Sequence, residues 1–95
     1  MRYEVWHHDV RAESRNFNFT PLAVSEWPEH YDHVATVEAG DLEDVFRLTN
    51  SMHVGWWLNE GVVAHNGPTR STSVGDVVES PDGRFVVDRF GFKRF

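Results

Sequence analysis

The sequence contains no cysteine, which excludes a disulfide framework, a thiolate metal site and a cysteine nucleophile. No uninterrupted apolar run approaches the roughly 20 residues that a membrane span requires. The segment MRYEVWHHDVRAES at residues 1–14 also has no apolar core of the kind found in secretion signals. We therefore expect a cytoplasmic protein that is neither exported nor inserted in a membrane.

The motifs of common catalytic chemistry are missing as well. The serines form no G-x-S-x-G elbow, and no trio of Ser, His and acid can be placed together from the sequence. The seven glycines are dispersed and form neither a P-loop nor a dinucleotide-binding fingerprint. We predict no catalytic residue, no cofactor and no enzyme activity, with a small hydrolase or metal enzyme as a remote alternative.

Positive charge is scarce. Fifteen acidic and nine basic residues give a net charge of −6, and nucleic-acid binding depends on clustered Lys and Arg. Direct nucleic-acid binding is therefore not expected. Four cations near the C-terminus support the alternative of a nucleic-acid-linked factor in replication, transfer or anti-restriction, and these are Arg84, Arg89, Lys93 and Arg94.

The chain does have a high proportion of aromatic residues. Four Trp, seven Phe and two Tyr occur among 95 residues, and 40% of the residues are apolar. A chain of this length has room for one core only, so we predict a single domain over residues 1–95. Because each buried ring removes about 150 to 250 Å² from water, aromatic side chains are expected to supply most of the core.

Apolar periodicity predicts strands over 1–9 and 33–39, a short strand at 62–64, and one helix over 41–51. Asp41 with Asp44 three residues later is typical of a helix start. Asn50 is suited to the helix C-terminus because Asn tolerates the left-handed conformation.

The C-terminal quarter predicts a β-hairpin. Segments 73–80 and 84–89 are apolar strands, and Pro81-Asp82-Gly83 between them has the residue types of a tight turn. Gly91 is expected to mark a bulge or a close backbone approach, and an exposed edge at 90–95 makes a homodimer conceivable. The fold expected is α+β, with an antiparallel sheet of four to five strands packed on one helix.

Two of these segments carry a resemblance to a known family. LEDVFRLTN within 41–50 and RSTSVGDVVE with VDRFGF within 70–92 resemble the YodL-like family of small accessory proteins. That family occurs in phages, mobile elements and bacterial chromosomes and has no established chemistry. The resemblance implies a non-enzymatic accessory protein that binds and modulates a host protein.

Two groups of residues are candidates for that binding. Adjacent large rings cannot easily enter one pocket, and a partly exposed Trp56 or Trp57 would suit a contact patch. The alternative, which we favour slightly, is that both rings pack, one under the helix and one against the sheet. Short polar side chains before the hairpin suit either a partner or their own backbone. The candidate protein-binding residues are Met52, His53, Trp56, Trp57, Arg70, Ser71, Ser73 and Asp76.

A metal site is the other possibility we considered. His30 and His33 lie beside Glu29 and Asp32, but a closed zinc site normally needs four ligands with supporting contacts. Additional ligands from His7 and His8 would point to opposite faces of a strand. We therefore predict no metal site.

Overall fold

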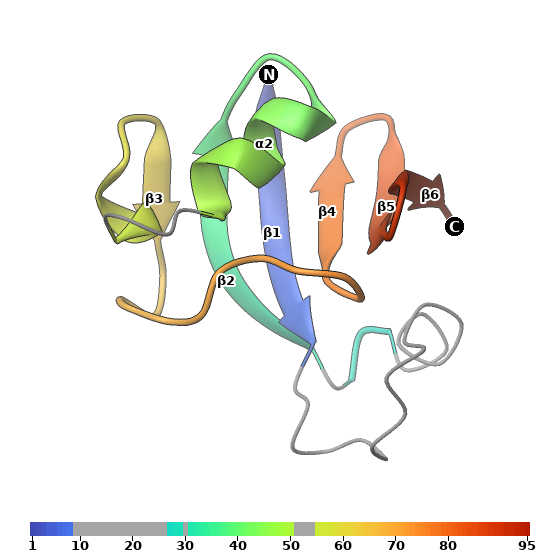
Figure 1. The fold of residues 1–95 in the computed structure, drawn as a ribbon, viewed down its shortest axis with the longest axis horizontal. Helices are drawn as coiled ribbons and strands as arrows, with labels where there is room; N and C mark the ends of the chain where they lie inside the picture. The colour runs from blue at the N-terminus through green and yellow to red at the C-terminus, as the bar shows by residue number, and fades with distance from the viewer. Residues whose placement is uncertain (9–26, 30, 51–54) are drawn as a thin grey trace.

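The computed structural model describes residues 1–8, 27–29, 31–50 and 55–95. Among these residues a six-stranded antiparallel sheet carries one helix, α2, which lies across β1 and β2 on one face (Figure 1). The α+β class is therefore confirmed, whereas the expected strand number of four to five is too low. None of the described helices is long and apolar enough to cross a membrane. The elements are β1 (Arg2–His8), β2 (Tyr31–Glu38), α2 (Leu42–Thr49), the 3-10 helix η2 (Trp56–Leu58), β3 (Val62–Ala64), β4 (Val77–Ser80), β5 (Gly83–Asp88) and β6 (Gly91–Arg94).

The two longest strands form the centre of the sheet. The strand order is β3-β2-β1-β4-β5-β6, so β3 and β6 are the edges. In the pairing of β1 with β2, Tyr3 lies opposite Val37 and Val5 opposite Ala35, with a shift of register after Val5. These four side chains are buried in the core on the helix side, as expected for strand positions two residues apart.

Helix α2 begins as the sequence predicts. The Asp41 side chain accepts a hydrogen bond of 2.8 Å from the Asp44 amide, and Val45 is fully buried against the sheet. Asn50 does follow the last turn, but its φ of −129° is not left-handed. Its side-chain amide instead donates to the Thr72 carbonyl oxygen at 2.6 Å, so the helix end is tied to a distant loop.

The C-terminal segment forms two hairpins rather than one interrupted pair. The predicted first strand over 73–80 begins only at Val77, because 73–76 form a turn in which the Asp76 amide donates to the Ser73 carbonyl oxygen. The bulge predicted at Gly91 is wrong. Asp88 lies opposite Gly91 across the Arg89-Phe90 turn, and a φ of +144° at Gly91 favours glycine there. This turn creates β6, the strand that the sequence analysis did not separate.

The described core is built mainly of valine, so the expectation that aromatic side chains supply most of it is not met in this part of the chain. Trp56 is the only aromatic ring among the largest fully buried side chains of the described residues. On the face away from the helix, Trp27 packs against Trp6, Tyr31 and Phe95, with ring centroids 5.0, 5.1 and 6.0 Å away. Both faces of the sheet therefore carry packed side chains. The fully buried valines of the described residues are Val5, Val37, Val45, Val77, Val78 and Val86.

Candidate functional site

Arg70, whose side chain is 36% exposed, forms an ion pair with the buried Asp76. The two terminal nitrogens of Arg70 donate to the two carboxylate oxygens of Asp76 at 2.7 Å each. The amides of His8 and Ser73 donate to the same carboxylate at 2.8 Å each. Asp76 is fully buried, so this carboxylate holds the end of β1 against the loop before β4.

His7 lies beside this pair on the helix side of the sheet. Its Nε2 is 2.9 Å from the Thr72 hydroxyl and 3.9 Å from an oxygen of Asp76. Its Nδ1 is buried and has no hydrogen-bond partner among the described residues. Burial is the main reason that the pKa of His7 falls from 6.5 to about 4, with Arg70 also lowering it and Asp76 and Asp32 opposing the shift. The ring is therefore neutral near neutral pH.

The tandem tryptophans occupy different environments. Trp56 is buried, and its Nε1 lies 3.0 Å from the carbonyl oxygens of Thr69 and Arg70. Trp57 is half-buried, and its ring lies so close to Gly55 that a Cβ at that glycine would collide with it. The predicted residues Met52 and His53 lie outside the described residues.

The polar candidates before β4 lie together. Ser73 is exposed and its hydroxyl accepts from Arg70 at 3.2 Å, while the Ser71 carbonyl oxygen accepts from the same guanidinium at 3.1 Å. The Ser73 amide also donates to the Asp76 carboxylate. Since Trp56 and Asp76 are buried, neither belongs to the surface that we propose below.

The edge strand β3 presents apolar side chains that the sequence analysis did not select. Leu58, the last residue of η2, is 76% exposed, and Val63 in the middle of β3 is 60% exposed. A hydrogen bond of 3.1 Å from the Val62 amide to the Asn59 carbonyl oxygen closes the turn between them. No strand of the described residues pairs with the outer side of β3 (Figure 1). All three residues of β3, Val62, Val63 and Ala64, are apolar, so the sequence does not indicate which face of the strand is covered. Tertiary packing determines that Val63 is exposed.

The C-terminal cations do not form one patch. Arg84 lies over the rings of Phe95 and Trp27, at 5.0 and 5.7 Å. Arg94 lies over the ring of Phe85 and donates to the Asp82 carbonyl oxygen at 2.7 Å. Strand pairing places Lys93 opposite Val86 and Arg94 opposite Phe85, so these neighbours point to opposite faces of the sheet.

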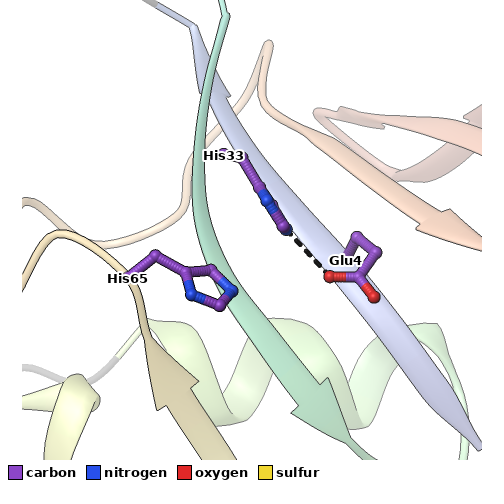
Figure 2. Close-up of side chains that lie close together, drawn as sticks. All are labelled: Glu4, His33 and His65. Atoms are coloured by element: carbon purple, nitrogen blue, oxygen red, sulfur yellow. Dashed lines mark hydrogen bonds and ion pairs between the residues drawn. The ribbon is translucent and has the colours of Figure 1, made fainter.

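A cluster of two imidazoles and a carboxylate lies on the face of the sheet away from α2. Figure 2 shows Glu4 on β1, His33 on β2 and His65 just after β3, with their side chains converging. The Nε2 of His33 is 2.8 Å from Glu4 Oε1, and the two imidazole centroids are 4.6 Å apart. The Thr36 hydroxyl donates to Glu4 Oε1 at 2.7 Å and lies 2.9 Å from His65 Nε2.

The surroundings hold each member of this cluster in place. The Trp6 ring stacks on His33 with centroids 4.6 Å apart, and the His65 amide donates to the Val34 carbonyl oxygen at 2.9 Å. Burial alone would raise the pKa of Glu4, but hydrogen bonds from Thr36, His33 and Arg2 outweigh it and hold that pKa below its usual value.

The histidine grouping considered from sequence is not the one that the structure brings together. His33 lies opposite Trp6 and Asp32 opposite His7, so Asp32 and His33 point to opposite faces, and His30 lies outside the described residues. Glu4, His33 and His65 are 29 and 32 residues apart along the chain, and only the pairing of β1, β2 and β3 unites them. Local spacing carries no signal of such a cluster.

Comparisons with known protein families, with curated proteins and with solved structures found no match.

Proposed function

We propose that this chain is a non-enzymatic, cytoplasmic accessory protein of a phage or mobile element, which binds a host protein through the edge of β3 and modulates it by occupying its surface. The observation that carries the proposal is that no strand of the described residues pairs with the outer side of β3, where Val63 of the strand and the nearby Leu58 are exposed. The resemblance of 41–50 and 70–92 to the YodL-like family supports the accessory role.

The two sheet edges differ in a way that favours β3. Lys93 and Arg94 lie on the four-residue strand β6, and charged side chains on an edge strand discourage pairing with another chain. The sequence of β3, Val62-Val63-Ala64, has no charge. The Val62 amide already donates to the Asn59 carbonyl oxygen, and the remaining outward backbone groups of β3 suit the addition of an extended segment of a partner, in which main-chain hydrogen bonds supply affinity and alternate side chains supply specificity.

The charge of this region indicates the chemistry of the partner segment. Glu60 is exposed in the turn that leads into β3, and the whole chain carries a net charge of −6. Opposite charge accelerates encounter and suppresses wrong partners. The segment that fits is therefore extended and apolar, with basic residues beside it.

Affinity purification from nuclease-treated bacterial lysate tests this proposal with two matched variants. Leu58→Asp places a charge beside β3, and Phe90→Asp places the same charge on another highly exposed apolar residue, 96% exposed in the turn before β6. We expect one nuclease-resistant partner with the wild type and Phe90→Asp, and its loss with Leu58→Asp.

Four results would contradict the proposal. The partner could be retained by Leu58→Asp, lost with Phe90→Asp alone, or recovered only when nucleic acid is intact. The last result would favour the nucleic-acid-linked alternative. Recovery of the untagged chain itself as the sole partner would show that the β3 edge pairs with a second copy instead of a host protein.

A further inference from the structure

The cluster of Glu4, His33 and His65 offers three ligand atoms from three adjacent chain segments. All three atoms lie within 4.8 Å of one another. The Glu4 and His33 side chains are 25% and 36% exposed, and His65 is exposed. An ion from solvent can therefore reach the cluster without any opening of the core.

Hydrogen atoms now occupy the positions between these groups. The single proton of the Thr36 hydroxyl is donated to Glu4, so His65 Nε2 must donate to the Thr36 oxygen across their 2.9 Å contact. His33 Nε2 likewise donates to the Glu4 carboxylate, which only accepts. A cation at the centre would replace these N–H donors, and each neutral imidazole would only shift its proton to Nδ1.

We propose that Glu4, His33 and His65 bind a divalent transition-metal ion, with Zn²⁺ the best match, and that water completes its coordination. Two imidazoles and one carboxylate are a ligand set that Zn²⁺ accepts in proteins, whereas Mg²⁺ and Ca²⁺ prefer oxygen ligands alone. A tetrahedral site with bonds of about 2.0 to 2.1 Å separates its ligand atoms by about 3.3 Å. The ligand atoms of the present cluster lie within 4.8 Å of one another, so they would have to move closer together on binding the ion.

The surroundings resemble the support that metal ligands require. The Trp6 ring fixes the plane of His33, the Thr36 hydroxyl orients Glu4, and such outer contacts set ligand orientation in metal sites. The bound ion would cross-link β1, β2 and the residue after β3. This site lies on side chains of the sheet face and is independent of the binding proposed for the backbone edge of β3.

Isothermal titration of the untagged protein with ZnCl₂ tests the site. We expect one ion per chain for the wild type and at least about tenfold weaker binding by His65→Gln and by Glu4→Gln. Glu38→Gln is the control, because Glu38 is a 64% exposed carboxylate that pairs with the N-terminal amine, and its affinity should equal that of the wild type. Imidazole ¹⁵N spectra should shift at His33 and His65 on addition of the ion.

Absence of binding at about 1 mM Zn²⁺, the weakest affinity relevant here, would overturn the proposal. Unchanged affinity of His65→Gln, or ¹⁵N shifts confined to other histidines, would also overturn it. Circular dichroism checks that each variant is folded. If Glu4→Gln disturbs β1, His65→Gln decides the question, because His65 is exposed and lies after the end of β3.

Discussion

Asp76 is a charged group that the fold has removed entirely from water. Its carboxylate receives two donors from Arg70 and two backbone amides, so its charge is compensated on both oxygens. Leaving a buried charge without its partner is strongly destabilising. The pair therefore stabilises the fold, and its loss should lower the free energy of unfolding.

Arg70→Met is predicted to lower the free energy of unfolding by about 3 kcal/mol, because it leaves the Asp76 carboxylate buried without a cation. Arg70→Lys should lower the free energy of unfolding by a smaller amount, because an ammonium group keeps the positive charge but cannot make the bidentate contact. Urea unfolding provides the measurement. Arg89→Met, at an exposed position, is the control and should change stability by less than about 0.5 kcal/mol. Equal changes in the free energy of unfolding for Arg70→Met and Arg89→Met would contradict a stabilising role of the Arg70–Asp76 pair.

His7 is predicted to make stability depend on pH. Its pKa is about 4 in the folded state against 6.5 ordinarily, so the unfolded state binds more protons between these values and stability falls as pH falls through that window. The part due to His7 amounts to about 2 kcal/mol between pH 7 and pH 5. Urea unfolding at both pH values should show this loss in the wild type and a correspondingly smaller loss in His7→Gln. A pH dependence that is the same in both proteins would show that His7 is not the group responsible.

At the scale of elements, the start of α2 was readable from sequence because its cap is local. Asp41→Ala removes the acceptor of the Asp44 amide and should cost about 1 kcal/mol of stability in urea unfolding. Glu43→Ala is the matched control, an exposed acid in the same first turn whose charge contributes only some tenths of a kcal/mol. Similar losses for both variants would mean that the helix dipole, not the cap, accounts for the effect.

The element boundaries that sequence reasoning misjudged depend on specific contacts that the residue types alone do not reveal. Asn50 adopts its conformation while donating to Thr72, and β4 begins late because Asp76 is drawn into its pair with Arg70. Gly91 was recognised as special, but its position opposite Asp88 depends on how two strands pair. Local patterns therefore predicted the type of most described elements, and tertiary contacts determined their ends.

At the scale of the whole molecule, the candidate sites were the least predictable feature. Trp56 was selected for its ring, yet that ring lies in the core, while Leu58 two residues later is exposed. Glu4, His33 and His65 meet only because the strand order places β1 and β3 on either side of β2. The order of strands in a sheet depends on long-range pairing, so local sequence patterns do not predict it.

We propose that β3 is the edge of the sheet that receives a partner. Site-specific photo-crosslinking in bacterial cells tests this binding, with the photoreactive residue at position 58 and, in a separate protein, at position 90. We predict one discrete host-protein adduct from position 58 and none from position 90. An adduct from position 90 alone, or none from position 58 with folded protein present, would contradict binding at β3.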